Sequence, residues 1–438
     1  MPAKMERVTV MVAEEEKLVG IEEYLTDTDG IGGKLRKTPE DFIVKETSIT
    51  PPEAPNGTWT IATVTSRNWE TNRLIRILSK DLRVSRDRIR FAGTKDKRAV
   101  TTQLMAFKVQ PDRVKAIQLK DVTIENVYLS NKGIDIGDLI GNQFEIKVSD
   151  LKFGAAGIVE DTACQVKDLE GFPNYFGIQR FGAIRPVTHL VGKAIVRGEF
   201  DKAVMQYLGN PTENEDPEIQ QIRRSITETG DLKEALKRLP PQLSFERTML
   251  QHLVRREKDY IGALRQLPKN LLMMFIHAYQ SYLFNLMLSE RMRRGLPLNT
   301  PIAGDMVIPT DKNGLPNHEE WIKVDKDNLT KVIRQCGNGN AFVSGLVMGA
   351  GTEFADGSQG EIEHKVIEAE GLVNKDFIIP DMPEMSSKGI RREVVSPVFN
   401  LKYHEVEDGI VFTFKLNRGC YATCLMREFM KSDDIRSY

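Results

Sequence analysis

Segments that alternate between apolar and polar residues occur near both ends of this chain, and they enclose a long region with helical periodicity. Alternation with a period of two is typical of β-strands that have one buried face, whereas apolar spacings of three and four are typical of amphipathic helices. The alternation predicts strands at residues 58–65, 89–92, 104–109, 122–129, 143–149 and 410–416. The helical spacing predicts helices at about residues 70–82, 155–169, 271–294 and 421–430.

Strands that follow one another directly, with helices at irregular intervals, favour an α+β fold over a doubly wound α/β fold. A chain of 438 residues also exceeds the length at which a single core usually stops growing, which favours two domains. Helix-like segments and turn clusters dominate between about residues 183 and 394, and we interpret this region as an insertion. The strand and helix after residue 396 are then expected to complete the sheet of the first half.

Composition narrows the class of protein. Apolar residues at 40% and charged residues at 28% are typical of a folded globular chain. The N-terminus has no signal-like apolar segment and no stretch approaches ~18 uninterrupted apolar residues, so we expect a cytoplasmic protein without membrane contact. The four cysteines form no Cys-x-x-Cys pair, the six histidines are scattered, and the glycine clusters at 30–33 and 349–351 resemble turns. We therefore expect side-chain chemistry without a metal or cofactor.

The net charge of −1 hides a basic segment. Residues 67–98 contain eleven Lys or Arg and four Asp or Glu, a local balance of +7. Within the predicted helix at 70–82, a basic face is expected opposite an apolar stripe of Leu74, Ile77, Leu78 and Leu82, and it consists of Arg73, Arg76, Lys80 and Arg83. Such a face is suited to following a phosphate backbone, and a plain solvated helix surface is the alternative.

Asp96 is the candidate catalytic residue. It lies in the run Phe91-Ala-Gly-Thr-Lys-Asp-Lys-Arg-Ala-Val-Thr-Thr-Gln103, which begins as a strand and breaks at Gly93. The neighbouring cations Lys95, Lys97 and Arg98 should keep an acid on this loop ionised and attract an anionic substrate. By spacing alone, a charged β-turn in which Asp96 offsets its neighbours is the favoured interpretation of the run.

Three further segments have unusual residue choices. Residues 35–46 place Arg36 and Lys37 just before a proline-limited turn, and residues 418–428 place a glycine before a helix N-terminus. Residues 173–182 combine three aromatic residues with Asn174 and Arg180, a composition suited to stacking a splayed base and bonding its edge. Core aromatics and an ordinary helix cap are the alternatives for the last two segments.

Taken together, these segments resemble the TruD family of pseudouridine synthases. The resemblance rests on Ala-Gly-x-Lys-Asp-x-x-Ala-Val-Thr-x-Gln at 92–103 and on Pro-Asn-Tyr-Phe-Gly-x-Gln-Arg-Phe-Gly at 173–182. Supporting matches occur at 39–42, 141–144, 281–285 and in the C-terminal Gly-x-Tyr-Ala-Thr block. The similarity is strong over about residues 30–183 and 396–430 and weak across the insertion.

The resemblance implies a cofactor-free isomerisation of uridine, typically uridine 13 of tRNA, to pseudouridine. Asp96 would act on the ribose of a flipped-out nucleotide, Phe176 would stack on its base, and Asn174 would bond nearby. Arg36 falls where the family carries a basic partner, and a bidentate Arg36–Asp96 pair would hold the aspartate ionised and aimed. Whether Asp96 attacks the anomeric carbon, removes a sugar proton or adds to the base stays open.

The family also implies a catalytic domain with a mixed, mainly antiparallel sheet, formed by residues 1–183 and 395–438. An inserted α+β domain, the TRUD domain, would span residues 184–394, and its extra segment at 185–270 has no assigned role. The implied partner is tRNA, with other RNAs and the oligomeric state left open. The predicted RNA-binding set is Arg73, Arg76, Lys80, Arg83, Lys95, Lys97, Arg98 and Arg180. A non-catalytic RNA-binding module and an aspartate hydrolase of small molecules are the rival functions.

Overall fold

The computed structural model describes residues 11–182 and 184–438 and divides into two compact units. The sheet unit comprises Thr26–Phe172, Ser396–Ser432 and Ser437–Tyr438. The helical unit comprises the described part of Met1–Leu25 together with Pro173–Val395 and Asp433–Arg436. The unit borders differ from the predicted domain borders at 183/184 and 394/395, and they place residues 11–25 with the helical unit. The predicted domain division itself stays a prediction.

The sheet unit is built on a nine-stranded sheet, with strand order β14-β15-β7-β2-β5-β3-β6, β1 beside β7 and β4 beside β5. Its strands are β1 (Gly32–Lys34), β2 (Phe42–Ser48), β3 (Trp59–Arg67), β4 (Ile89–Phe91), β5 (Val100–Phe107), β6 (Val122–Ser130), β7 (Leu139–Leu151), β14 (Phe399–Val406) and β15 (Gly409–Asn417). The β2–β5 pair is parallel and the other described pairs are antiparallel. This mixed, mainly antiparallel sheet confirms the predicted α+β class.

Helices of the sheet unit are α2 (Thr71–Asp81), α3 (Pro111–Lys115), α4 (Ala155–Asp168) and α14 (Ala422–Met430). Helix α2 packs its apolar face onto β3 and β5, burying Leu74, Ile75 and Leu78. The predicted stripe was wrong at one position, because Ile75 is buried where Ile77 was expected and Ile77 is only half-buried. Spacings of three and four from Leu74 lead to Ile77 and Leu78. The buried face of α2 is wider than this stripe and is centred nearer to Ile75.

The C-terminal strand completes the sheet of the first half, as predicted. β15 pairs with β7 from Gly409 to Asn417. The strands approach closely at Gly141, where an added Cβ would lie 2.2 Å from the carbonyl oxygen of Leu416. A side chain there would push the strands apart, which explains a glycine at the start of the Gly-Asn-Gln-Phe motif.

Two local predictions were wrong. β5 begins at Val100 rather than near residue 104, because Val100–Thr102 pair in parallel with Ile43–Lys45 of β2. This partner is about 57 residues away in the sequence, and the polar residues Thr101 to Gln103 give no apolar–polar alternation. Gly32 and Gly33, expected in a turn, form most of β1, with backbone φ values of 62° and 91°.

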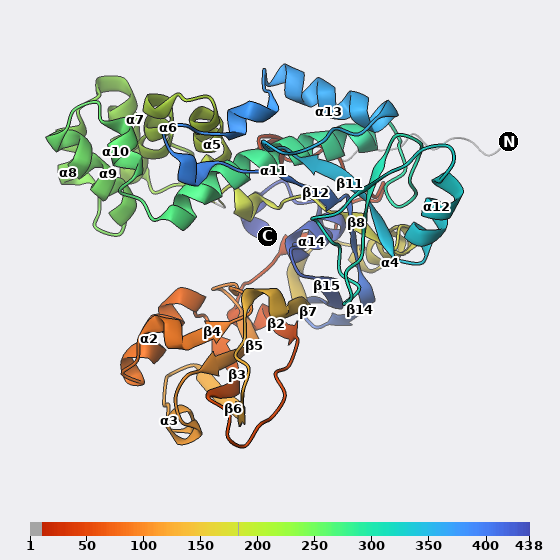
Figure 1. The fold of residues 1–438 in the computed structure, drawn as a ribbon, viewed down its shortest axis with the longest axis horizontal. Coiled ribbons are helices and arrows are strands. Elements are labelled where there is room, and N and C mark those ends of the chain that lie inside the picture. The colour runs from red at the N-terminus through yellow and green to blue at the C-terminus, as the bar shows by residue number, and fades with distance from the viewer. Residues whose placement is uncertain (1–10, 183) are drawn as a thin grey trace. The chain divides into compact units, whose positions relative to one another are not determined.

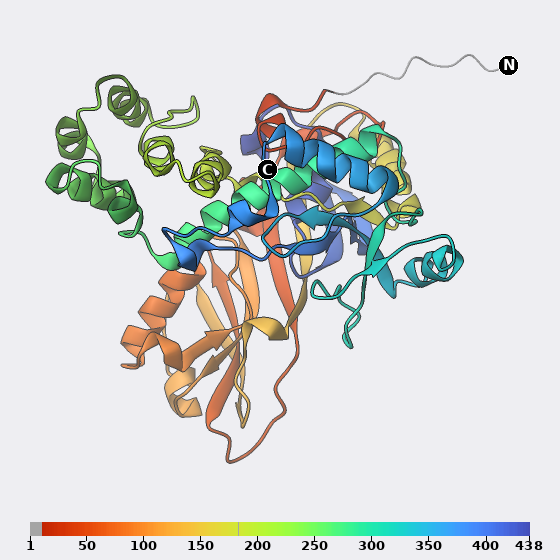
Figure 2. The same cartoon turned by 45° about the horizontal axis from the view of Figure 1, so that its top comes forward.

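The helical unit surrounds the long helix α11 (Lys269–Arg293), which α5 and α13 contact (Figures 1 and 2). Its other helices are α1 (Glu14–Lys17), α5 (Thr188–Val196), α6 (Phe200–Leu208), α7 (Pro217–Thr229), α8 (Leu232–Arg238), α9 (Ser244–Arg255), α10 (Tyr260–Leu264), α12 (Leu329–Gly337) and α13 (Gly357–Ala369). A four-stranded antiparallel sheet has the order β10-β9-β11-β12, with β9 (Met306–Pro309), β10 (Ile322–Lys323), β11 (Ala341–Val347) and β12 (Ile390–Glu393). The chain passes between the units in β8 (Gly171–Pro173) and β13 (Val395–Pro397).

Among the described residues, α11 is the one helix long and apolar enough to cross a membrane by length and composition. Of its most apolar window, 67% is buried inside the protein. Phe275, Tyr279 and Leu283 of α11 lie in the main core cluster of the helical unit. This extent of burial is typical of a helix in the core of a protein.

Candidate active site

Asp96 lies in the loop between β4 and β5 of the sheet unit. The backbone N–H of Lys95 donates to the Thr71 hydroxyl at 2.8 Å, which ties this loop to the first turn of α2. The Asp96 side chain is 49% exposed, so its carboxylate is accessible to solvent and to a substrate.

Arg36 contacts the Asp96 carboxylate. Its Nη2 donates to Asp96 Oδ1 at 3.2 Å, and its side chain is only 13% exposed. The guanidinium carbon lies 3.9 Å from the centre of the Phe42 ring, a cation–π contact that fixes the plane of the group. The pairing of Arg36 with Asp96 was anticipated, but the bidentate geometry was wrong, because the described contact is a single hydrogen bond.

The electrostatics of Arg36 favour this pairing. Burial lowers the pKa of Arg36, the Asp96 carboxylate raises it in part, and the charge of Arg98 lowers it further. Because an arginine pKa ordinarily lies far above neutral, the group stays cationic at neutral pH. Arg98 also donates from Nη2 to the Arg36 carbonyl oxygen at 2.8 Å. A mostly buried cation of this kind holds its counter-ion, Asp96, in place.

The other cations around Asp96 separate into two kinds. Lys97 and Arg98 are exposed. The Lys95 side chain is 4% exposed, and its Nζ lies 2.5 Å from Glu46 Oε2 in a buried ion pair. Lys95 therefore braces the loop from inside and does not belong with the exposed cations.

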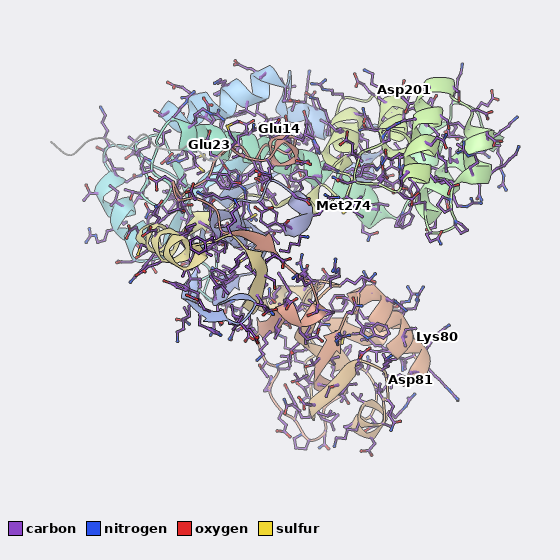
Figure 3. The ribbon with its side chains drawn as sticks, turned by 180° about the vertical axis from the view of Figure 1, so that it is seen from behind. Glu14, Glu23, Lys80, Asp81, Asp201 and Met274 are labelled. Atoms are coloured by element: carbon purple, nitrogen blue, oxygen red, sulfur yellow. The ribbon has the colours of Figure 1, made fainter. Side chains whose placement is uncertain are left out.

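The basic face of α2 is present. Arg73, Arg76 and Lys80 are exposed along the helix, and Arg83 is exposed just after its end (Figure 3 labels Lys80). Arg73 also lies over the Trp69 ring at 5.2 Å. The face opposite these cations packs into the core, so the four side chains form one basic surface of the sheet unit.

Asn174 belongs to the helical unit and is fully buried. Its Nδ2 donates to the backbone oxygen and to Oε1 of Glu393, both at 3.0 Å. Its Oδ1 accepts a hydrogen bond from Arg392 Nη2 at 2.7 Å. Both ends of the amide are therefore bonded within the protein, and Asn174 supports other side chains.

Phe176 is half-buried in the same loop. The guanidinium carbon of Arg392 lies 4.2 Å from the centre of its ring, and Phe284 meets it edge to face at 5.4 Å. Asn285 fixes its backbone, because Asn285 Oδ1 accepts from the Phe176 N–H at 2.9 Å and Nδ2 donates to the Phe176 carbonyl at 3.0 Å. The guanidinium of Arg180 lies farther away, 6.0 Å from the ring centre. The ring is therefore held at its backbone and against its neighbours.

Glu393 anchors this arrangement. Its Oε2 lies 2.7 Å from His318 Nε2, while Oε1 accepts from Asn174. Burial raises the pKa of Glu393, but the hydrogen bond to His318 and the charge of Arg392 outweigh it, so the pKa lies below its usual value. Glu393 is thus a buried, ionised carboxylate with both oxygens bonded.

The sequence-predicted site residues fall into two groups. Asp96, Arg36 and the α2 cations belong to the sheet unit, and Asn174, Phe176 and Arg180 belong to the helical unit. Within the described residues, no group of three or more His, Cys, Asp or Glu side chains could hold a metal ion.

A family model described as tRNA pseudouridine synthase D (TruD) matches residues 18–429 of this chain. The chain belongs to the TruD family of tRNA pseudouridine synthases. TruD enzymes are isomerases. The family match confirms the resemblance to TruD that the two sequence motifs indicated.

Similar TruD proteins cover nearly the whole chain. The probable tRNA pseudouridine synthase D of Methanosarcina acetivorans is 42% identical over 435 residues, 97% of this chain and 98% of that protein. That of Thermococcus sibiricus is 36% identical over 417 residues, 93% of this chain and 97% of that protein. The crystal structure of a putative TruD from Methanosarcina mazei has a TM-score of 0.85 and 42% identity, covering 97% of this chain and 99% of that chain. Coverage of this extent includes most of the segment 185–270.

Sequence reasoning missed Arg392, Glu393 and His318. Arg392 and Glu393 lie in β12 and are buried, although a run of charged residues ordinarily indicates an exposed strand edge. The sequence feature that could have revealed Arg392 and Glu393 is a run of three charged residues, Arg391 to Glu393, enclosed by the apolar residues Ile390 and Val394. Asn285 lies in the helix motif at 281–285 that carried part of the resemblance, but its role as a backbone clamp was not predicted.

Proposed function

We propose that this TruD-family protein converts uridine 13 of tRNA to pseudouridine, with Asp96 as the carboxylate that acts on the ribose. The observation that carries the proposal is the Asp96–Arg36 pair, in which an exposed loop carboxylate is bonded to a mostly buried guanidinium. Membership of the TruD family supports the reaction and the class of RNA.

The reaction requires no electron carrier because it is an isomerisation. The bond from the ribose C1′ to N1 of uracil breaks, a bond from C1′ to C5 forms, C5 loses a proton and N1 gains one. C1′ gains positive charge as its bond to nitrogen breaks, and a fixed, ionised carboxylate stabilises that charge. Arg36 keeps Asp96 in one position without neutralising it through proton transfer, since a guanidinium does not deprotonate at neutral pH.

The base must leave the RNA stack before its sugar bond can be reached. In this proposal Phe176 supplies the aromatic surface on which the displaced uracil stacks. Asn174 acts indirectly, since its amide is bonded to Glu393 and Arg392, and Arg392 lies against the Phe176 ring. It is therefore a positioning residue.

The exposed cations would contact phosphates of the tRNA and set its position. This proposed set consists of the exposed residues Arg73, Arg76, Lys80, Arg83, Lys97 and Arg98, together with the half-buried Arg180. Lys95 is left out because Glu46 pairs with it inside the protein.

The test is to incubate the full-length protein with an unmodified tRNA transcript and to map pseudouridine by chemical labelling and primer extension. A matched transcript with cytidine at position 13 is the control. Pseudouridine at position 13 of the first transcript and at no position of the second is expected. Modification at another position would overturn the assignment of uridine 13, and tRNA binding without any modification would favour the rival RNA-binding module.

A further inference from the structure

Helix α9 presents two different faces. Helices α7, α8, α9 and α10 gather at one end of the helical unit (Figure 1), within the segment 185–270. The face of α9 toward the core carries the buried residues Glu246, Met249, Leu250 and Leu253. The other face carries the polar residues Thr248, Gln251, His252 and Arg255. Spacings of three and four place each set on one side of the helix.

The polar face of α9 lines a surface cavity of about 370 Å³. We call this cavity the α9 pocket, and its lining consists of Thr248, Gln251, His252, Arg255, Arg256 and Gln266. The lining contains two guanidinium groups, neutral hydrogen-bond donors and no carboxylate. Such a lining is suited to an anion with several acceptor oxygens.

The nearby acid Asp259 forms no ion pair with either arginine, although the His252 hydrogen bond and, to a smaller extent, the charge of Arg256 lower its pKa. Asp259 Oδ2 lies 2.8 Å from His252 Nε2, and Asp259 Oδ1 accepts the Gly262 N–H at 2.9 Å. Among the residues that the structure describes, neither Arg255 nor Arg256 forms an ion pair. Both are exposed at the C-terminal end of α9, so their charge is available to a ligand.

Cations at a helix C-terminus are favourable for the helix itself, and this effect alone accounts for the presence of Arg255 and Arg256. It does not account for the cavity or for the neutral donors around it. A second cavity, of about 340 Å³, lies at α6 and α7 and is lined by Lys202 and Arg224 together with the acid Glu228. Both linings therefore contain two cations, and the α9 pocket differs in having no acid among its lining residues.

We propose that the α9 pocket binds a backbone phosphate of the RNA substrate. The proposal rests on the proposed function, which makes tRNA the ligand. Guanidinium groups match the geometry of phosphate oxygens, and contacts to phosphate position an RNA without reading its sequence. The segment 185–270 thereby acquires a role in tRNA binding.

The test compares tRNA binding by full-length wild type and by the double variant Arg255→Gln/Arg256→Gln across a series of salt concentrations. The double variant is expected to bind about 3–10-fold more weakly at moderate salt, with a log Kd against log salt slope smaller by about 1 or 2. Rates of pseudouridine formation at saturating tRNA should match the wild type, because the lining includes none of the residues proposed to act on the uridine. Lysine replacements at both positions should restore most of the slope, since they keep the charge.

Arg224→Gln is the matched control, because Arg224 is an exposed arginine of the second cavity, and it should leave affinity and slope unchanged. Thermal unfolding of each variant checks that the fold is intact. An unchanged Kd and slope in the folded double variant would overturn the proposal. If inorganic phosphate stabilises the wild type but not the double variant while tRNA binding is identical, the pocket binds free phosphate and the RNA assignment is wrong. These readouts measure binding, so they stand apart from any failure of Asp96 in catalysis.

Discussion

Asp96 and Glu393 are both carboxylates beside an arginine, yet the two units hold them in opposite ways. Asp96 is 49% exposed and accepts a hydrogen bond from Arg36 at 3.2 Å. Glu393 is buried, and its oxygens lie within hydrogen-bond distance of Asn174 and His318. A buried charge is tolerated only when it is fully bonded, whereas an exposed one remains available for reaction. The contrast fits the proposed function, in which Asp96 is the reacting group and Glu393 supports the base-stacking surface.

The largest effect on stability should come from Glu393. Replacing it by alanine removes the partner of Asn174 and His318 and leaves polar groups buried without their bonds. Breaking such a buried network typically costs about 3–5 kcal/mol, and urea unfolding should report a loss of that size. Glu361→Ala is the control, since Glu361 forms an exposed ion pair with Arg294 and should cost about 1 kcal/mol or less. Equal losses of unfolding free energy in Glu393→Ala and Glu361→Ala would contradict the distinction between a buried, fully bonded carboxylate and an exposed one.

His189 tests the cost of a buried titratable group away from the proposed site. Burial, with a smaller contribution from the charge of Lys193, lowers the pKa of His189 to about 4. The unfolded chain, with an ordinary pKa near 6.5, binds this proton first, so stability falls as the pH drops from about 6.5 toward 4. His189→Gln should remove roughly 2–3 kcal/mol of that loss between pH 7 and pH 4.5, measured by urea unfolding.

The exposed His404 provides the comparison for this pH series. His404→Gln should leave the pH dependence of stability as it is in the wild type. If His189→Gln follows the wild-type curve as well, His189 is not the buried neutral group described here.

Phe176 should affect catalysis more than stability. Phe176→Leu keeps an apolar side chain but loses the flat surface for the displaced base. Stacking of one base on an aromatic residue contributes about 1–3 kcal/mol, so kcat/KM for tRNA should fall by about 5–150-fold. Phe245→Leu, an exposed aromatic of α9, serves as the control and should retain wild-type kcat/KM. Wild-type kcat/KM in Phe176→Leu would remove Phe176 from the proposed site.

The basic face of α2 should give the smallest effect. Arg76→Ala with Lys80→Ala should weaken tRNA binding several-fold, reduce the salt slope by about 2 and leave folding intact. Binding measured across salt concentrations decides between RNA contact and a plain solvated surface. An unaltered salt slope would show that this face is a plain solvated surface.

The sequence predicted more of the Asp96 loop and α2 than of the contacts around Asn174 and Glu393. A contiguous motif located the Asp96 loop and local periodicity located α2, although Asp96 pairs with Arg36, 60 positions away. The contacts of Asn174 join residues 218 and 219 positions apart, and no local periodicity records a partner at that distance. Burial of Arg392 and Glu393 depends on the tertiary structure around β12, which overrides the ordinary expectation that charged residues are exposed.

The start of β5 shows the same limit in the fold. Its first residues, Val100 to Thr102, pair in parallel with β2 and antiparallel with β3, and their local sequence pattern records neither partner. By contrast, β3 and β15 have strong alternation of their own and appear close to where the sequence predicted them.

The central claim is that Asp96 carries the reaction and not the fold. The most direct measurement is single-turnover pseudouridine formation in tRNA by the wild type, by Asp96→Asn and by Asp150→Asn. Asp150 is the matched control, because its side chain is also 49% exposed and pairs with a cation, Lys37, at 2.6 Å. Asp96→Asn should lower the rate by at least about 10³-fold with unchanged thermal unfolding, while Asp150→Asn should stay near the wild-type rate. A wild-type rate in Asp96→Asn would contradict the account.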